Sequence, residues 1–200
     1  MLLNDRQIRA LAEEHGMIEP FLPSLIREID HWYPFGRIKC ISFGPSSFGY
    51  DIPLSVKDFG IFRHVPGTVI NPKDFNPKNL EKAESDVDEW GEFFIIPGNS
   101  YALGTTPVNL TMPRNVTGHI FGKSTYARCG IILNATPVEP GWKGKLTLEF
   151  SNSSPADVRV YANEGVAQIW FFQGDPPETC YADRNGKYQN QPETIITSRV

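Results

Sequence analysis

The feature that most limits the fold of this chain is a series of short β-prone segments between residues 37 and 172. Turn-forming stretches such as G-P-S-S, N-P-K and P-G-N separate them. Many short strands at this spacing are typical of a β-sandwich or a distorted β-barrel. The segments expected to be strands are residues 38–43, 50–54, 60–63, 68–70, 93–96, 100–105, 108–112, 116–121, 131–134, 145–150, 156–161 and 166–172.

The start of the chain instead predicts one short helix. Asn4 and Gln7 have the spacing of an N-cap and its capping-box partner, an apolar stripe follows, and Gly16 suits a helix stop. Residues 17–36 show no clear period, so we expect a loop with at most one helical turn. Residues 71–91 are charged and rich in turn formers, which indicates a surface excursion.

The length of 200 residues suits a single domain with a real hydrophobic core. Within it we expect an N-terminal helix over residues 1–16, a β core over residues 37–172, and a C-terminal tail over residues 183–200. The tail lacks apolar periodicity and could be mobile.

Composition argues against several classes of partner. The formal net charge of −4 gives no basic surface for nucleic acid, and no apolar run approaches the roughly 20 residues of a membrane span. Charged residues stand near the N-terminus where a secretory signal needs its apolar segment, so a cytoplasmic protein is expected. Cys40, Cys129 and Cys180 are odd in number and widely spaced, which favours neither a disulfide framework nor a cysteine zinc site.

One strand presents a carboxylate on its polar face. Leu146, Leu148 and Phe150 alternate with Thr147 and Glu149, the period of a half-buried strand. The apolar residues should enter the core, and Glu149 should point to the other face. Such a carboxylate is either a surface charge or a general base in a cleft, and the strand pattern alone favours the surface charge.

The G-K-S-T stretch that begins at Gly122 does not fit a P-loop, because only three residues separate Gly118 from Gly122 and a strand pattern precedes it. It predicts a short helical turn with Ser124 as N-cap. Lys123 and exposed N–H groups at the start of that turn would suit a phosphate, and Arg128 lies one turn further on. A capped structural turn with a surface arginine is equally consistent.

Two further features have a structural and a functional interpretation. Gln168 lies in an apolar run, so its amide must bond to other protein groups or to a ligand, and the former is the commoner outcome. The tail sequence G-K-Y-Q-N-Q at residues 186–191 is either a frayed terminus or a lid over an anionic ligand, and composition favours the terminus.

Several motifs together resemble those of the dCTP deaminases. They are K-S-T-Y-A-R-C-G-I, T-P-V-E-P-G-W, L-T-L-E-F-S-N, Y-A-N-E-G-V-A-Q and G-K-Y-Q-N-Q, in this order. S-S-F-G-Y-D at residues 46–51 resembles the N-terminal motif of that family, which is similar to the first motif of the trimeric dUTPases. The resemblance covers nearly the whole chain and is densest over residues 121–191.

This resemblance implies a mainly β chain with a short N-terminal helix and a few helical turns. The subunit would be a distorted, jelly-roll-like β-barrel of the dUTPase-like fold, and homotrimers would form active sites between subunits. The implied reaction is hydrolysis of dCTP to dUTP and ammonia, which supplies dUTP for thymidylate synthesis. Mg²⁺ would bind through the triphosphate, with no zinc and no protein side chain as metal ligand, and dTTP would act as a feedback inhibitor.

The resemblance also implies roles for individual residues. Glu149 matches the catalytic carboxylate, and Ser124 and Arg128 match the pair that supports the water and the reaction centre. A metal-free deaminase needs such a base, and the H-x-E and P-C-x-x-C signature of zinc deaminases is absent. The implied nucleotide contacts are Lys123, Ser124, Thr125, Tyr126, Ala127, Arg128, Glu139, Thr147, Leu148, Glu149, Gln168, Tyr181, Lys187 and Gln191.

The sequence departs from some family members at one place and leaves rival functions open. Thr136 and Pro137 stand where those members have His-Arg, so no base contact is assigned there. A bifunctional relative that releases dUMP and pyrophosphate ranks second, because such enzymes tend to have Asp and an aromatic residue where this chain has E-P-G-W. A nucleotide-binding regulator without catalysis ranks third, because it would not need Glu149, Ser124 and Arg128.

Overall fold

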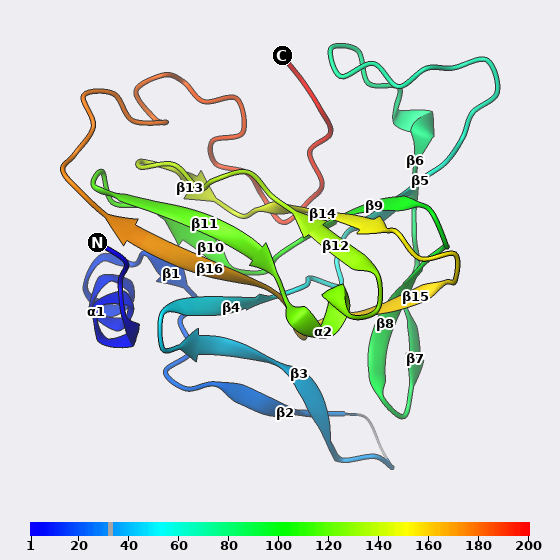
Figure 1. Ribbon diagram of the computed structural model, residues 1–200, viewed down its shortest axis with the longest axis horizontal. Helices are drawn as coiled ribbons and strands as arrows, with labels where there is room; N and C mark the ends of the chain where they lie inside the picture. The colour runs from blue at the N-terminus through cyan, green and yellow to red at the C-terminus, as the bar shows by residue number, and fades with distance from the viewer. Residues whose placement is uncertain (32–33) are drawn as a thin grey trace.

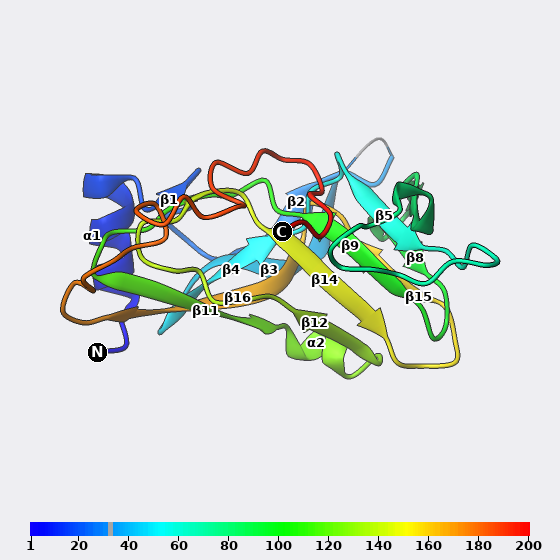
Figure 2. The ribbon, with the colours of Figure 1, turned by 90° about the horizontal axis from the view of Figure 1, so that it is seen from above.

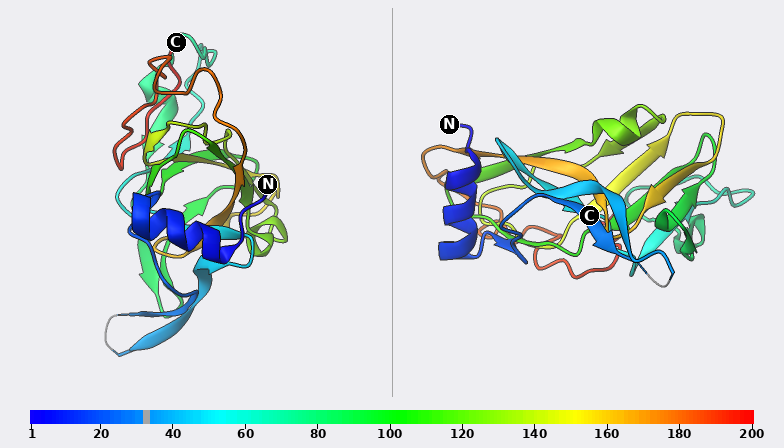
Figure 3. Two further views of the ribbon diagram at one scale, coloured as in Figure 1. Left: turned by 90° about the vertical axis from the view of Figure 1, so that its left-hand side faces the viewer. Right: turned by 90° about the horizontal axis from the view of Figure 1, so that it is seen from below.

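The structure is a computed structural model that describes residues 1–31 and 34–200. Within these residues the strands form two five-stranded and two three-stranded sheets, which are arranged around one axis (Figures 1 and 3). The predicted mainly β class and distorted barrel are therefore confirmed. No helix in the described ranges has the length and apolar character needed to cross a membrane.

All strand pairs in these sheets are antiparallel. One large sheet has the order β11 (Val116–Gly122), β16 (Gly165–Gln173), β4 (Gly49–Pro53), β3 (Arg37–Ser46) and β2 (Ile26–Asp30). The other has the order β12 (Ile131–Asn134), β14 (Thr147–Asn152), β9 (Tyr101–Thr105), β5 (Phe59–Phe62) and β6 (Leu80–Lys82). The small sheets are β1 (Ile18–Glu19), β10 (Asn109–Thr111) and β13 (Lys143–Gly144), and β15 (Val158–Tyr161), β8 (Gly91–Ile96) and β7 (Asp86–Asp88).

The core lies between the sheets and is rich in aromatic side chains. Phe59 stacks on Phe94 with ring centroids 4.3 Å apart, and Phe150 packs against Phe59 at 5.8 Å. All three rings are fully buried, and burying one such side chain contributes about 1.5–3 kcal/mol. Phe150 and Leu148 enter this core from β14, so the alternation expected for that strand is present and Glu149 lies on the outer face.

The expected N-terminal helix is present as α1 (Asp5–His15), with the predicted residues at both of its ends. Asn4 accepts a hydrogen bond from the Gln7 N–H, the Gln7 side chain returns to the Asn4 N–H, and Gly16 ends the helix in the left-handed conformation. Ile8 and Ala12 are buried against the barrel. The helix closes one end of the molecule, as Figure 3 shows.

The expected loop over residues 17–36 was wrong in part, because it contains β1 and β2. β2 is the edge strand beside β3, where Glu28 lies opposite Lys39 and Asp30 opposite Arg37. Such cross-strand pairs of opposite charge support an edge strand that has no strong apolar period of its own. Residues 32–33 lie outside the described residues.

The region after β5 also differed from expectation. Residues 68–70 do not form the expected strand, and Val69 is 89% exposed. The expected surface excursion over residues 71–91 contains a 3₁₀ turn (Pro77–Asn79) and the strands β6 and β7, which pair with β5 and β8. Pairing with a neighbouring strand, which local composition does not reveal, orders these polar segments.

A buried carboxylate next to β16 gives the fold a predicted pH dependence. Glu164 is 2% exposed and accepts a hydrogen bond from the Ile41 N–H at 2.5 Å. Burial raises the pKa of Glu164 from 4.5 to about 7, although this bond lowers it. Because the pKa is raised in the folded state, the stability linked to protonated Glu164 is present below pH 4.5 and lost as the pH rises through 7.

We therefore expect Glu164→Gln to gain stability relative to the wild type as the pH rises. The gain between pH 4.5 and pH 8 should be on the order of 2–3 kcal/mol, because the amide keeps the acceptor and carries no charge. Urea unfolding at the two pH values measures it, and Glu81→Gln on the exposed edge of β6 is the matched control. If the difference in free energy of unfolding between the variant and the wild type does not change with pH, the raised pKa assigned to Glu164 is contradicted.

Candidate functional site

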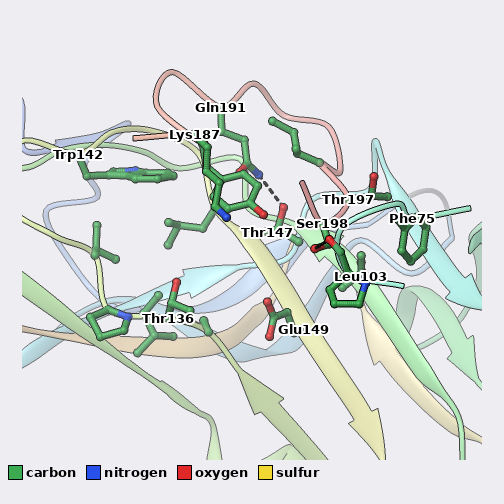
Figure 4. A pocket seen from close by; sticks show the side chains of 18 of the residues that line it. Phe75, Leu103, Thr136, Trp142, Thr147, Glu149, Lys187, Gln191, Thr197 and Ser198 are labelled. Atoms are coloured by element: carbon green, nitrogen blue, oxygen red, sulfur yellow. Dashed lines mark hydrogen bonds between the residues drawn. The ribbon is translucent and has the colours of Figure 1, made fainter. Parts of the chain in front are cut away.

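A cavity of about 670 Å³ lies on the outer face of β14 and β9. Its other walls are the turn over residues 135–142, the loop over residues 70–75 and the C-terminal tail, which crosses above β14 (Figures 2 and 4). Six of the predicted contact residues line it: Glu139, Thr147, Glu149, Tyr181, Lys187 and Gln191.

Glu149 is half-buried on the floor of this cavity, where its carboxylate points into the space below Lys187 (Figure 4). Its Oε2 accepts a hydrogen bond from Asn134 Nδ2 at 2.8 Å and a longer one from the Tyr101 hydroxyl at 3.4 Å. Both donors reach it from neighbouring strands, because Asn134 lies opposite Glu149 on β12 and Tyr101 lies on β9. Among the described residues, both of these hydrogen bonds go to Oε2, and Glu149 also lines the cavity.

Tyr101 is held as a neutral donor beside this carboxylate. Burial and the adjacent charge of Glu149 raise the pKa of Tyr101 to about 12. The phenol therefore keeps its proton at neutral pH and orients the carboxylate without competing for protons. Sequence reasoning missed both Tyr101 and Asn134, since only the register of β12, β14 and β9 brings them to Glu149.

The P-V-E-P-G-W turn forms the wall that faces β14. The Trp142 N–H donates to the Glu139 carbonyl at 3.1 Å and closes the turn. Gly141, just before Trp142, has a φ of 77°, a conformation that favours glycine. The Glu139 carboxylate pairs with Arg184 of the tail. Tyr181, just before the tail, packs against Trp142 with ring centroids 5.2 Å apart, so the tail and the residues that lead into it contact the turn at two points.

The tail continues over the cavity and brings an amide next to the floor. Gln191 is 5% exposed, and its Nε2 donates to Thr147 Oγ1 at 2.7 Å, as Figure 4 shows. The Gln191 carbonyl also accepts from the Lys145 N–H at 2.9 Å. Lys187 extends into the cavity from the same segment, and its ammonium group lies 5.7 Å from the centre of the Tyr188 ring. The predicted lid residues thus lie above Glu149.

A second group of predicted residues lies away from this cavity, around a buried ion pair. Lys123 Nζ pairs with Asp51 and also donates to the Ser42 carbonyl at 2.7 Å, and the two charged side chains are 13% and 7% exposed. Gln168 Nε2 donates to Asp51 Oδ1 at 2.7 Å, and its Oε1 accepts from Trp170 at 2.7 Å. Protein groups therefore satisfy the Gln168 amide, and the Lys123 ammonium is neutralised by Asp51.

The helical turn α2 (Ser124–Ala127) is displaced by one residue from its expected start. Lys123 is the N-cap, no side chain caps the turn, and Ser124 is the first helical residue, so the expected Ser124 cap was wrong. Ser124, Thr125, Ala127 and Arg128 are exposed on the outside of the molecule.

Two predicted contacts have buried side chains. Tyr126 is 5% exposed, and its hydroxyl accepts from the Tyr161 N–H at 2.9 Å. Leu148 is fully buried under β14. The side chains of these two residues are therefore not available to a ligand in this chain. In the described part of the chain, no group of three or more His, Cys, Asp or Glu side chains is placed to hold a metal ion.

Comparison with known proteins gives the family. A model of the dCTP deaminase-like family matches residues 2–174. The chain belongs to this family. It is 50% identical over 189 residues to a dCTP deaminase of Dechloromonas aromatica and 51% identical over 191 residues to one of Acidovorax sp., and each match covers 94% of both chains.

A solved structure agrees with the fold. The crystal structure of 2′-deoxycytidine 5′-triphosphate deaminase from Agrobacterium tumefaciens matches 86% of this chain with a TM-score of 0.53 and 17% identity. This chain spans 48% of the length of that one. The barrel described above is therefore shared with a member of the family.

The buried ion pair below α2 yields a stability prediction. Asp51→Ala would leave Lys123 buried without a counter-charge, which typically costs about 3–5 kcal/mol. Arg63→Met, which breaks the exposed pair between Arg63 and Glu81, should cost less than about 1 kcal/mol. Urea unfolding of both variants makes the comparison. Similar small losses for the two would show that the Asp51–Lys123 pair does not hold this part of the barrel together.

Proposed function

We propose that this protein hydrolyses dCTP to dUTP and ammonia, with Glu149 as the general base. The observation that carries the proposal is the position of Glu149, a half-buried carboxylate that faces a cavity of nucleotide size. The relatives that are half identical over nearly the whole chain support the choice of substrate. A regulator without catalysis would have no need for an oriented carboxylate on the cavity floor.

The proposed chemistry needs one carboxylate that takes and returns protons. Glu149 removes a proton from a water molecule as the water oxygen bonds to C4 of cytosine. The electron pair of the N3=C4 bond moves to N3, which takes up this proton from Glu149. The second proton of the water, now on the C4 hydroxyl, passes through Glu149 to the 4-amino group. The C4–N4 bond then breaks, and ammonia leaves as the C4 carbonyl forms. The hydrogen bonds from Asn134 and Tyr101 fix one carboxylate oxygen, so the other is directed at the reacting water.

The tail is proposed to bind the charged end of the nucleotide. Lys187 supplies a cation above the cavity, and Gln191 and Thr147 supply polar groups beside Glu149. Mg²⁺ is proposed to bind through the triphosphate, whose oxygens are the hard ligands that this ion prefers, and to neutralise part of the phosphate charge. We further propose a cytoplasmic location and inhibition by dTTP, which carries the same triphosphate and deoxyribose.

The exposed residues on α2 are proposed to complete the site of a neighbouring subunit in a homotrimer. Ser124 and Arg128 point outward and do not line the cavity of their own chain. Apolar side chains are exposed beside them, with Phe121 at 40% and Ile132 at 58%. Exposed apolar groups of this kind are commonly covered at subunit interfaces. A trimer would place an α2 donor pair against each Glu149 cavity and would cover this surface.

Product analysis tests the proposed reaction. We expect the protein, given dCTP and Mg²⁺, to form dUTP without pyrophosphate when the nucleotides are separated by ion exchange. Glu149→Gln should lose at least about 10³-fold in kcat while still binding dCTP, because the amide cannot accept the proton. Glu81→Gln, a remote exposed carboxylate, is the matched control and should keep full activity.

Other products would select the rival functions. Formation of dUMP and pyrophosphate would favour a bifunctional deaminase and diphosphatase. Binding of dCTP with no turnover would leave the nucleotide-binding regulator and would overturn the role given to Glu149.

A further inference from the structure

The tail carries a carboxylate, Glu193, that none of the functional motifs includes. Its side chain is 13% exposed, although the tail lies on the surface. Ser55 Oγ donates to Glu193 Oε1 at 2.6 Å, Lys57 Nζ donates to Oε2 at 3.0 Å, and Lys145 Nζ donates to the same oxygen. These three donors come from the body of the barrel, so Glu193 is a link between tail and body.

The electrostatics of this cluster favour the charged, bound form of Glu193. Burial raises the pKa of Glu193, but hydrogen bonds from Lys145, Ser55 and Lys57 outweigh it and lower the pKa to about 2. Lys145 is only 23% exposed, so its interaction with Glu193 is less screened by solvent and salt than a surface pair. Glu193 therefore stays ionised well below neutral pH.

The position of Glu193 connects this cluster to the cavity. Gln191, two residues earlier, bonds to Thr147 next to Glu149, and its carbonyl accepts from the N–H of Lys145 itself. Two residues later, the Ile195 N–H donates to Asp58 at 2.7 Å. A fixed Glu193 therefore holds the segment on both sides of it, including the amide that reaches the cavity floor.

The other ion pairs of the tail are much more exposed. Arg184 and Glu139 are 52% and 42% exposed, and Arg114 and Asp183 are 56% and 38% exposed. Exposed pairs of this kind contribute about 0–1 kcal/mol each. Lys57 in the Glu193 cluster is 67% exposed as well, so among the pairs that join the described tail to the barrel the Glu193–Lys145 pair is the one shielded from solvent.

We propose that Glu193 is a positioning residue that holds the tail closed over the cavity. Through Lys145 and Ser55, Glu193 keeps Gln191 and Lys187 in place before the nucleotide binds. Because the tail is already ordered, less conformational entropy is lost when the nucleotide binds. The claim that Glu193 affects nucleotide binding rests on the function proposed above. The claim that Glu193 holds the tail closed does not depend on that function. Loss of Glu193 should weaken nucleotide binding more than it slows the chemical step.

The experiment compares Glu193→Gln with Asp183→Asn, a matched carboxylate-to-amide change in an exposed tail pair. We expect Glu193→Gln to raise the KM for dCTP about 10-fold with kcat within about twofold, because the closed state is less populated but unchanged in geometry. For Asp183→Asn, we expect both KM and kcat to stay within about twofold of the wild-type values. Lys145→Met should match Glu193→Gln, and the double variant should be no worse than either single one, as for two partners in one interaction.

Trypsin provides a readout that needs no substrate. Cleavage after Lys187 in the nucleotide-free protein should be about 10-fold faster in Glu193→Gln than in the wild type or in Asp183→Asn, with the same melting temperature. Unchanged cleavage would overturn the closed-tail role. Faster cleavage with an unchanged KM would overturn the link to nucleotide binding. If the wild type does not turn over dCTP, the proposed reaction falls, and trypsin still decides whether Glu193 holds the tail.

Discussion

The packing of β14 is the constraint on which the candidate site depends. Leu148 and Phe150 are fully buried in the aromatic core, so the strand cannot rotate or slip by one residue without exposing both. That constraint fixes Glu149 on the opposite face, where the cavity lies. The same register brings Asn134 and Tyr101 to the carboxylate, so the stability of the barrel and the orientation of the proposed base have one cause.

A second physical theme is the division of the predicted residues between two faces of one chain. The cavity collects Glu149, Thr147 and the tail, whereas α2 presents Ser124 and Arg128 to the outside, above a buried ion pair. A buried pair costs desolvation of both charges, so it gives the turn a defined position more readily than extra stability. This arrangement suits a donor group that completes a site on another subunit.

The sequence predicted what is local and missed what depends on register. The helix signals of Asn4, Gln7 and Gly16 and the two-residue period around Glu149 operate over a few residues, and both appear in the structure as expected. The pairing of Lys123 with Asp51 spans 72 residues and follows from how β16 aligns with β11 on one side and with β4 on the other, which no local pattern encodes. The edge strand β2 was missed for the same reason, because cross-strand charges support it where periodicity does not.

The shared site can be tested most directly with hybrid oligomers. Glu149→Gln and Arg128→Ala, each expected to be inactive alone, would be co-expressed with different tags and purified through both. If one subunit supplies Glu149 and the next supplies Arg128, each hybrid trimer contains one intact site, and activity should return to about a third of the wild-type value. Hybrids as inactive as the two parents would contradict a site shared between subunits.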